Sequence, residues 1–395
     1  MKVLVINSGS SSLKAQLMET DTNEVLAKAY CQRIGLDKAF MEYKTSEKRV
    51  IEHDMPTHKE AFELLFATIV DKEIGVISSL DEVKAVGHRM VNFGEKYNKS
   101  IVVTEEIYND LQKCVHFAPL HNPPALIGIR NCMDLMPDKK NVAVFDTAFH
   151  ATMPEKAYMY AIPYEFYSEN KIRRYGAHGT SHRYIAMKCA EIMGDLKGKK
   201  IISCHLGSGS SVCAIKDGIC VDTSMGFTPL AGLVMGTRSG DIDPSVIKDI
   251  MNIKDISIDE TINLLNKKSG AVGLCGYSDM RDIEANFADP KAKLTFDMMV
   301  YSIKKYIGSY AAAMNGVDAI VFTAGIGERD EKMREAVCQD MEYLGLEFDA
   351  EKNITMHKPF DLIQDYSKPS SKVRVYRIPT DEEYIIAMDT ATLAK

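Results

Sequence analysis

Two stretches of the chain carry the same pattern of hydrophobic and polar residues. Residues 2–17 contain a short apolar run rich in β-branched residues, then a Gly/Ser cluster, then a second apolar run, and residues 200–215 repeat this order. The pattern predicts two strands joined by a tight turn in each copy. The turns begin at Asn7 and His205, half the chain apart. We interpret this as an internal duplication, which predicts two similar lobes with a cleft between them.

Elsewhere, apolar runs alternate with segments of helical periodicity. Buried strands are predicted at residues 83–87, 141–145, 318–323 and 373–378. Helices are predicted at residues 57–70, 296–314, 331–344 and 381–394, the last with Thr380 or Asp381 as its N-cap. Residues 270–273 follow no strand and are predicted to form a turn. The alternation indicates an α/β fold made of two duplicated lobes.

The chain is long enough for two domains. The crossing between lobes is expected soon after residues 146–150, and the final helix is expected to return to the first lobe. The first lobe is therefore predicted to comprise residues 1–150 and 380–395, and the second residues 151–379. With 46% hydrophobic and 26% charged residues in a chain of 395, each lobe can bury a core of its own.

Composition excludes several classes of partner. The net charge of -7 argues against nucleic acid or an anionic membrane as the main partner. The nine cysteines are scattered without a C-x-x-C pair, and Cys204, Cys213 and Cys275 lie in apolar runs typical of small core residues. The chain shows neither a signal-peptide pattern nor an apolar stretch long enough to span a bilayer. We therefore expect a cytoplasmic protein in a reducing compartment.

Three Gly-rich turns follow predicted strands, at residues 8–12, 206–211 and 325–327. Glycine and serine let the backbone approach phosphate oxygens closely and aim N–H groups at them. Any one of these turns alone is more simply an ordinary hairpin, but three of them, two being copies, favour a nucleotide site. Neither the P-loop nor the Rossmann glycine motif is present.

His178 and His182 have the i, i+4 spacing of a helical zinc site. Gly179 between them, and the lack of a nearby Glu or Cys ligand, argue against zinc. We predict instead that one of these histidines is presented beside a phosphate at the start of a helix. For His182 the alternative is a helix N-cap with a buried histidine.

Charged residues at loops and strand ends are the other candidates. Lys14 lies two residues past the first turn, where its ammonium group can reach a terminal phosphate. Arg89 and Arg238 suit a substrate with carboxylate and phosphate oxygens. Asp146 closes an apolar strand and is either a cap or a catalytic carboxylate. For Lys14 and the two arginines a surface role is the alternative.

Asn7 and Glu382 come from opposite ends of the chain. If the last helix returns to the first lobe, these two side chains can share a magnesium ion, which prefers oxygen ligands.

Together these segments resemble the acetate kinase family, part of the superfamily of acetate and sugar kinases, heat-shock ATPases and actin. The first matching stretch is Asn7-Ser-Gly-Ser-Ser-Ser-Leu-Lys14. The others are residues 87–89, 118–123, 145–150, 173–176, 178–182, 205–207, 222–240, 279–282, 322–328 and 379–383. The resemblance covers the whole chain, and several of these motifs are long and specific.

The resemblance implies two actin-like lobes, a homodimer, and direct in-line transfer of a phosphoryl group between ATP and acetate. It implies dimerisation and nucleotide binding by the second lobe, with magnesium or manganese held by Asn7 and Glu382. The implied ATP contacts are Lys14, His205, Leu206, Gly207, Ser208, Gly209, Asp279, Met280, Arg281, Gly325, Ile326, Gly327, Glu328 and Arg329. The implied catalytic residues are Asp146, His178 and Arg238, and the implied acyl-binding residues are Arg89, Val91, Leu120 and Pro229.

The chain departs from the family pattern at residues 92–93, 177, 208 and 329. Ala177 replaces a Phe that lines the acyl pocket, which predicts greater tolerance of propionate or butyrate unless Phe93 refills the space. Ser208 and Arg329 each replace an Asn, which could alter the nucleotide preference. A small carboxylic acid titrates at about 4.3 and is ionised at neutral pH. We therefore expect Asp146 to orient Arg89 or a metal-bound water rather than to act as a base.

Two other functions fit parts of this pattern. The nearer alternative is a propionate or butyrate kinase, which has the same chemistry and a larger acyl pocket. The other is an actin-like or chaperone-like ATPase module, in which Arg89, His178 and Arg238 would have no clear role.

Overall fold

The computed structural model describes residues 1–119 and 121–395. Leu120, one of the acyl-pocket residues that the resemblance implies, lies outside the described residues. The chain divides into two compact units. Unit 1 comprises residues 1–148 and 381–395, and unit 2 comprises residues 149–380.

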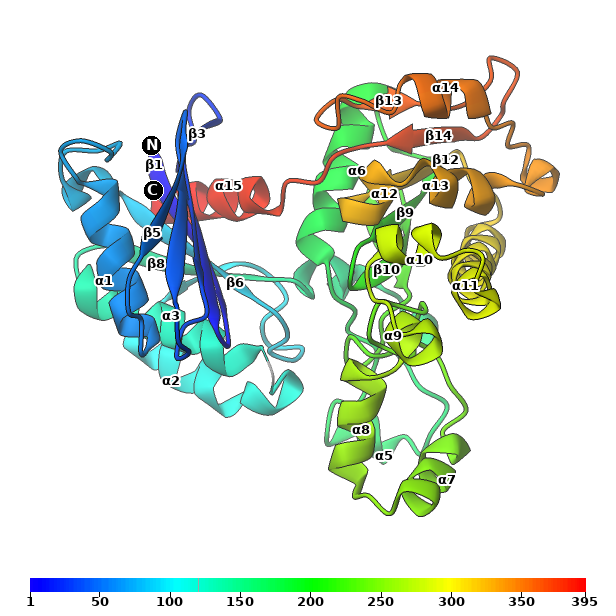
Figure 1. Ribbon diagram of the computed structural model, residues 1–395, viewed down its shortest axis with the longest axis horizontal. Helices are drawn as coiled ribbons and strands as arrows, with labels where there is room; N and C mark the ends of the chain where they lie inside the picture. Colours follow the sequence, from blue (N-terminus) through cyan, green and yellow to red (C-terminus); the bar gives the residue numbers. More distant parts are fainter. Residues whose placement is uncertain (120) are drawn as a thin grey trace. The chain divides into compact units, whose positions relative to one another are not determined.

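Unit 1 is built on an eight-stranded sheet with the strand order β5-β4-β3-β2-β1-β6-β8-β7 (Figure 1). The strands are β1 (Lys2–Gly9), β2 (Ser12–Glu19), β3 (Glu24–Gln32), β4 (Phe40–Lys44), β5 (Lys48–Glu52), β6 (Ala85–Met90), β7 (Ile101–Val103) and β8 (Lys140–Phe145). Strands β1 to β5 form an antiparallel meander, whereas β6 runs parallel to both β1 and β8.

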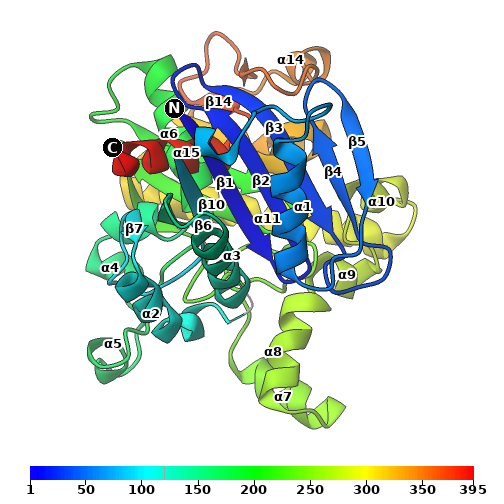
Figure 2. The same ribbon diagram turned by 90° about the vertical axis from the view of Figure 1, so that its left-hand side faces the viewer.

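Alternate residues of β1 point to opposite faces of this sheet. Leu4 and Ile6 enter the core under α1 (His58–Ile69) and α3 (Asn122–Leu135), the latter flanked by α2 (Glu105–Lys113). Val3 and Val5 pack instead against α15 (Glu382–Ala394). Figure 1 shows α1 and α15 on opposite sides of the sheet, and Figure 2 looks onto the face that α1 and α3 cover. The last helix of the chain thus closes the unit that the first strand begins.

Unit 2 is built on a six-stranded sheet with the order β11-β10-β9-β12-β14-β13. Its strands are β9 (Lys200–Leu206), β10 (Ser210–Lys216), β11 (Ile219–Thr223), β12 (Ala319–Thr323), β13 (Gln364–Asp365) and β14 (Arg374–Arg377). Its helices are α4 (Glu155–Tyr158), α5 (Glu165–Ser168), α6 (Gly179–Met193), α7 (Ser245–Lys254), α8 (Ile258–Lys267), α9 (Gly270–Cys275), α10 (Met280–Ala285), α11 (Pro290–Met314), α12 (Ala324–Arg329), α13 (Glu331–Cys338) and α14 (Ala350–Thr355). Short 3-10 helices occur in both units, and they are η1 (Leu80–Glu82), η2 (Val115–Phe117), η3 (Ala148–Thr152) and η4 (Glu342–Leu344).

Helices cover both faces of this second sheet as well. Ile202 and Cys204 of β9 enter the core formed with α9, α10, α11 and α13. Ile201 of β9 and Cys213 of β10 enter the opposite core, which contains Ile185 of α6.

The two sheets share one topology. The central order β3-β2-β1-β6-β8 of unit 1 corresponds to β11-β10-β9-β12-β14 of unit 2. In both, an antiparallel hairpin leads into a parallel pair, β1 with β6 and β9 with β12. This confirms the predicted α/β fold of two duplicated, actin-like lobes.

Two predicted turns are wrong, because both segments are helical. Residues 270–273 begin α9, whose first N–H groups are bonded by a distant loop: Ala271 N donates to Met235 O and Val272 N to Gly236 O, each at 2.9 Å. Residues 325–327 lie in α12, where the Glu328 carboxylate accepts a hydrogen bond from Ala324 N at 2.8 Å.

Three other predicted boundaries are shifted. α11 starts six residues before the predicted 296, since Asp289 caps it and Pro290 occupies the first helical position. The helix predicted at 331–344 ends at Cys338. The strand predicted at 83–87 runs from Ala85 to Met90.

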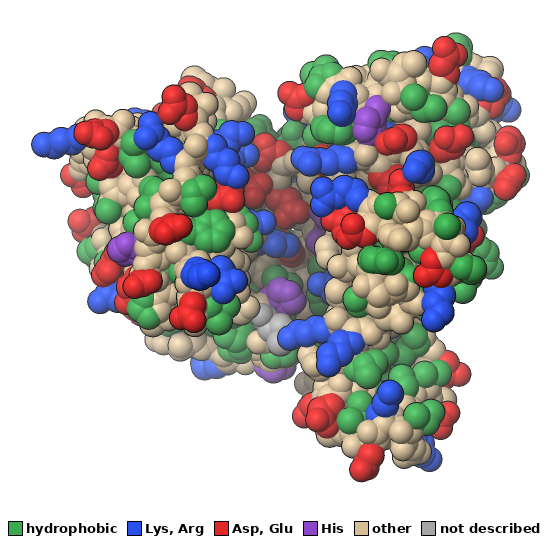
Figure 3. Space-filling model, viewed as in Figure 1, with side chains coloured by type: hydrophobic (Ala, Val, Ile, Leu, Met, Phe, Trp, Pro, Cys, Tyr) green, Lys and Arg blue, Asp and Glu red, His purple; other side chains and the backbone are tan. Residues whose placement is uncertain are grey.

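None of the helices among the described residues is long and apolar enough to cross a membrane. On the face seen in Figure 3, acidic and basic side chains are interspersed over each unit.

Candidate functional site

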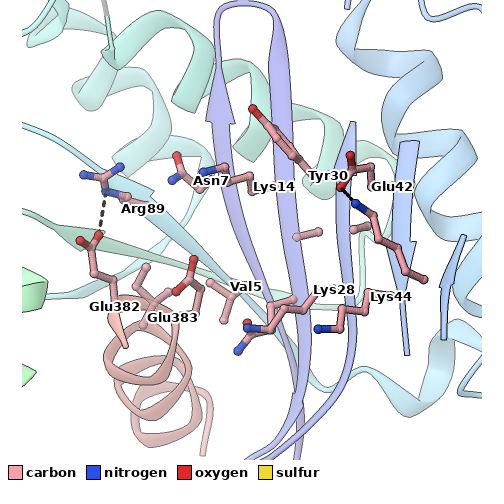
Figure 4. A pocket seen from close by; sticks show the side chains of 15 residues that line it. Val5, Asn7, Lys14, Lys28, Tyr30, Glu42, Lys44, Arg89, Glu382 and Glu383 are labelled. Carbon is pink, nitrogen blue, oxygen red and sulfur yellow. Dashed lines mark ion pairs between the residues drawn. The ribbon is translucent and has the colours of Figure 1, made fainter. Parts of the chain in front are cut away.

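Unit 1 contains an open pocket of about 350 Å³ at the side of its sheet. Asn7 of β1 and Lys14 of β2 are directly paired in the strand register, and both line this pocket. Arg89 of β6 and the first-turn residues Glu382 and Glu383 of α15 line it too (Figure 4). The helix comes from the other end of the chain and is fixed by its N-cap, because Asp381 accepts a hydrogen bond from Tyr384 N at 2.9 Å.

Arg89 and Asp146 form a two-point ion pair at the end of β6. Arg89 Nη2 lies 2.7 Å from Asp146 Oδ2, and Nε lies 3.2 Å from Oδ1. A third contact, 3.7 Å from Nε to Glu382 Oε2, joins the arginine to α15. The negative charge of Asp146, and to a lesser extent those of Glu382 and Glu383, raises the pKa of Arg89 far above its usual value. The strand end thus presents a permanent cation whose orientation is fixed by a buried carboxylate.

The same pocket has the composition of a site for a divalent cation. Asn7 and Glu382 offer oxygen ligands, which Mg²⁺ prefers. Burial foremost, together with Asp146 and Glu383 and against the lowering effect of Arg89, raises the pKa of Glu382 to about 7. A cation beside Glu382 would relieve this by stabilising the ionised carboxylate. The residues therefore fit the ion that the resemblance implies.

Unit 2 brings three histidines together around Ser211 of β10. His178 stands at the N-cap of α6 with a left-handed backbone, φ 59°. Its Nδ1 lies 2.9 Å from Ser211 Oγ, and its ring stacks on that of His205 with 4.0 Å between centroids. His205 is itself paired with Ser211 in the β9–β10 register. One hydroxyl thus orients a histidine ring at the start of a helix.

His182 lies one turn further along α6 and is completely buried. Its Nε2 lies 2.8 Å from Ser211 Oγ, and its Nδ1 lies 2.9 Å from Ser203 Oγ. Burial, with His150 and His205 nearby, lowers the pKa of His182 well below 6.5. His178 and His182 therefore share a serine through these bonds, and His182 is a neutral, structural part of the network.

The Gly-rich loop after β9 lies against a second arginine. A Cβ at Gly209 would stand 3.2 Å from Arg238 Nη1, so glycine lets the guanidinium approach the loop. Arg238 Nη1 also donates to Pro229 O at 3.2 Å. Within the loop, Ser210 Oγ donates to Gly207 O at 2.9 Å. His205 and Leu206 are buried at the end of β9, whereas Ser208 is exposed.

The third Gly-rich segment, residues 325–327, is fixed by hydrogen bonds with two side chains, those of Glu328 and Arg334. Glu328 accepts hydrogen bonds from Ala324 N at 2.8 Å and from Thr380 N at 3.0 Å. Completely buried Arg334 donates to Gly327 O at 2.9 Å. Nothing within the protein lies within 4 Å of a Cβ built at Gly325, so the backbone there is open to a ligand.

Other implied nucleotide residues lie at the edges of helices. The Arg329 guanidinium lies 5.3 Å from the centre of the Phe360 ring. Asp279 caps α10 and pairs with exposed Arg281 at 2.6 Å. Met280 is buried, and Ile326 is partly buried against the core of unit 2.

The positions expected from the sequence to affect acyl selectivity are packed within their own units. Ala177 is 3% exposed and clusters with Met225 and Met235. Phe93 is completely buried, with its ring centroid 5.5 Å from that of Phe145. Val91 follows β6 and is partly buried.

Sequence reasoning missed the side chains that orient these groups. Ser211, Ser203 and Ser181 each bond a histidine, the last to His205 Nδ1 at 2.8 Å. Arg334 was missed as well, because its neighbours Gly327 and Asn353 are brought to it only by the fold. A serine between apolar residues of a buried strand, as Ser203 is between Ile202 and Cys204, is the one signal that could have found it.

Comparisons with known proteins agree with this geometry. A sequence model of the acetokinase family matches residues 2–388. The acetate kinase of Clostridium botulinum is 52% identical over 395 residues, covering 99% of this chain and 98% of the relative. That of Thermotoga maritima is 53% identical over 401 residues, covering 100% and 99%.

Solved structures extend the likeness to the fold. A crystal structure of Porphyromonas gingivalis acetate kinase superposes with a TM-score of 0.94 at 46% identity, covering 100% of both chains. A propionate kinase from Francisella tularensis superposes with a TM-score of 0.93 at 38% identity, covering 99% of both chains. The chain therefore belongs to the acetokinase family.

Proposed function

We propose that the protein is an acetate kinase, which transfers the γ-phosphoryl group of ATP reversibly to acetate and gives acetyl phosphate and ADP. Family membership and the full-length identity to acetate kinases support this function. The structural observation that carries it is the two-point pair between Arg89 and Asp146, a fixed cation suited to a small carboxylate.

Arg89 is the group we assign to the acyl carboxylate. Asp146 engages Nε and Nη2, and a guanidinium carries five N–H donors in a planar fork. The donors on Nη1 therefore suit a carboxylate lying in the same plane. Such charge-assisted bonds both strengthen binding and fix the direction of the acid.

Asp146 acts as a positioning residue in this proposal. The attacking group is acetate, which is already ionised at neutral pH because a carboxyl group titrates at about 4.3. No proton has to be removed for its oxygen to attack phosphorus. Asp146 is 1% exposed and is engaged by Arg89, which supports an orienting role over that of a general base.

Phosphoryl transfer depends mainly on positioning and on neutralising the charge of the transferred group. We assign this role to Lys14, His178 and Arg238. The Nδ1 bond to Ser211 fixes the ring of His178, so Nε2 is the atom we assign to a phosphoryl oxygen. The γ-phosphoryl group of ATP moves directly to the acetate oxygen, with ADP as the leaving group and without a phosphorylated residue.

A divalent ion belongs to the proposed reaction as well. Mg²⁺, or Mn²⁺ in its place, would neutralise phosphate oxygens of the nucleotide, and Asn7 and Glu382 are the residues that would hold it. The nucleotide contacts are assigned to the segments at residues 205–209, 279–281 and 325–329. The openness of Gly325 and the support of Gly327 by Arg334 favour the third segment.

We propose that the enzyme favours acetate over longer acids. Ala177 is almost wholly buried and clusters with Met225 and Met235, so these methionine side chains adjoin the space that a Phe would take at position 177. One methylene gives roughly 1–3 kcal/mol of discrimination in an apolar pocket. Pro229, whose carbonyl bonds Arg238, and Val91 are proposed to line the pocket.

We further propose a homodimer acting in the cytoplasm. Exposed apolar side chains on helices of unit 2, such as Ile253 of α7, Ile258 of α8 and Tyr301 of α11, favour a protein partner. Because the proposed reaction uses ATP, we propose the cytoplasm as the location of the enzyme.

The test is ADP formation from magnesium-ATP with and without acetate. A kinase forms ADP at a rate that rises with acetate and saturates. ADP formed at the same rate without any carboxylate would support the ATPase module instead and overturn the proposal.

A further inference from the structure

Three side chains able to ligate a soft metal ion lie together inside unit 2. His150 Nδ1, Cys213 Sγ and Cys220 Sγ are all within 4.8 Å of one another. They belong to η3, β10 and β11, and all three residues are completely buried. The sequence suggested only that Cys213 is a small core residue.

The histidine is held in the form that binds metals. His150 Nε2 lies 2.9 Å from Ala177 O, and a carbonyl can only accept, so Nε2 carries the proton. Nδ1 therefore presents its lone pair to Cys220 Sγ, 3.1 Å away. A carbonyl that fixes the tautomer from the far side of the ring is a common support for a metal-binding histidine.

The two thiols adjoin each other on neighbouring strands. Cys213 Sγ lies 3.5 Å from Cys220 Sγ. The thiolate is the form that ligates metals, so a divalent ion that reaches both sulfur atoms takes the place of their two protons.

The geometry and charge suit a divalent ion. Zinc bonds of about 2.0–2.1 Å to nitrogen and about 2.3 Å to sulfur require separations of roughly 3.5–3.8 Å between tetrahedral ligands. The two separations that involve Cys220, 3.1 and 3.5 Å, reach this range after shifts of a few tenths of an ångström, and the third separation is at most 4.8 Å. Two thiolates with a neutral imidazole cancel a double positive charge, so the buried complex is neutral. Cys220 Sγ also donates a hydrogen bond to the backbone carbonyl of Asp222 at 3.5 Å.

We propose that His150, Cys213 and Cys220 form a binding site for one thiophilic divalent ion of the Zn²⁺ type, separate from the ion of the phosphoryl-transfer reaction. Binding forms two metal–sulfur bonds and one metal–nitrogen bond and releases two thiol protons to solvent, with no change of oxidation state. Thiolate and imidazole ligands select against Mg²⁺, which prefers oxygen.

The position of the site suggests its route of access and its effect. β11 is the edge strand of its sheet, so local opening of one strand admits an ion to Cys220. Ala177, whose carbonyl bonds His150, immediately precedes His178. A bound ion therefore stabilises unit 2 and pins the backbone that presents His178.

The test uses the reduced, chelator-treated full-length protein with excess Mg²⁺ to saturate oxygen sites. Cd²⁺ is added, and the sulfur-to-cadmium charge-transfer absorption, the proton release and the thermal unfolding temperature are followed. We expect saturation at one Cd²⁺ per chain, two protons released per ion, and a raised unfolding temperature. Competition by Zn²⁺ should remove the absorption.

Variants assign the ligands. Cys213→Ser and Cys220→Ser should each weaken binding at least tenfold, an order-of-magnitude expectation for a lost ligand. Cys189→Ser is the matched control, since this thiol is completely buried in the same core cluster, and it should bind as the wild type does. If either serine variant fails to fold, the stoichiometry of Cd²⁺ binding and the proton release of the wild-type protein still test the proposal.

Three outcomes would overturn the proposal. These are no charge-transfer absorption in the wild type, binding without proton release, and absorption that survives in the Cys213→Ser/Cys220→Ser double variant. The last would place the ion on other cysteines.

Discussion

The guanidinium of Arg89 is clamped by the carboxylate of Asp146, with Nη2 to Oδ2 at 2.7 Å and Nε to Oδ1 at 3.2 Å. The two residues end neighbouring parallel strands, β6 and β8, although 57 positions separate them in the chain. In the proposed function the remaining Nη1 donors of the arginine bind the acyl carboxylate, which would make Asp146 part of acid recognition.

Replacing Asp146 by Asn should lower kcat/KM for acetate without adding a pKa to the pH profile. Loss of a charge-assisted bond costs about 1.5–3 kcal/mol, or roughly tenfold to hundredfold. The measurement is kcat/KM against pH for both proteins, with Asp134→Asn as control, because Asp134 forms an exposed ion pair with Arg130 at 2.6 Å. A pKa that appears or vanishes in the Asp146→Asn profile would show instead that the residue titrates during turnover.

Arg89→Lys should raise the KM for acetate at least tenfold and leave the KM for ATP nearly unchanged. Lysine keeps the charge but cannot bond Asp146 and a carboxylate in one plane. Steady-state kinetics with each substrate varied in turn check this, and Arg130→Lys, at a surface ion pair, is the control. Equal increases in both KM values would contradict the assignment of Arg89 to the acid.

Ser211→Ala and Ser203→Ala should separate orientation of His178 from stability. Both changes remove a buried bond to His182, which costs about 1–3 kcal/mol. Only Ser211 also bonds His178, so only Ser211→Ala should lower kcat as well. The measurements are denaturant unfolding and kcat of both variants. Similar kcat values in the two variants would refute the role of Ser211 in orienting His178.

Gly325→Ala should raise the KM for ATP without destabilising the protein. The added methyl group meets no protein atom within 4 Å, so it should be felt only by a ligand that approaches this backbone. Gly308→Ala in α11 is the matched control, expected to leave KM unchanged and to stabilise the helix by about 0.5–1 kcal/mol. An unchanged KM in Gly325→Ala would remove this segment from the nucleotide site.

Acidification should destabilise the protein through His88. Burial lowers its folded pKa from 6.5 to about 4, so its contribution is complete above pH 6.5 and is lost as pH falls towards 4. At 1.36 kcal/mol per pKa unit the loss is about 3 kcal/mol. Denaturant unfolding between pH 7 and pH 4 should give a flatter profile for His88→Gln than for the wild type or for the exposed control His53→Gln. Parallel profiles would contradict this.

The duplicated architecture could be predicted from sequence because its signal is local. Each apolar run around a Gly/Ser turn became a hairpin, β1–β2 and β9–β10, with the expected residues. The helices α9 and α12 could not be predicted. Their first N–H groups are satisfied by the Met235–Gly236 loop and by the Glu328 side chain, contacts that glycine-rich sequence does not reveal.

The candidate site likewise contains residues that could be predicted from the sequence and residues that could not. Arg89, Asp146 and His178 lie at the ends of strands or helices, and these ends can be recognised in the sequence. Ser211 was missed because its role depends on strand register, which sets it opposite His205. Cys220 and His150 lie 70 positions apart, so only the fold makes them neighbours.

The most direct test of the proposed function is the formation of acyl phosphate, trapped as the hydroxamate, with magnesium-ATP and acetate, propionate or butyrate in parallel. We predict product with all three acids at saturating concentration and the highest kcat/KM for acetate. A higher kcat/KM for propionate or butyrate, or no acyl phosphate with any acid, would contradict the proposal.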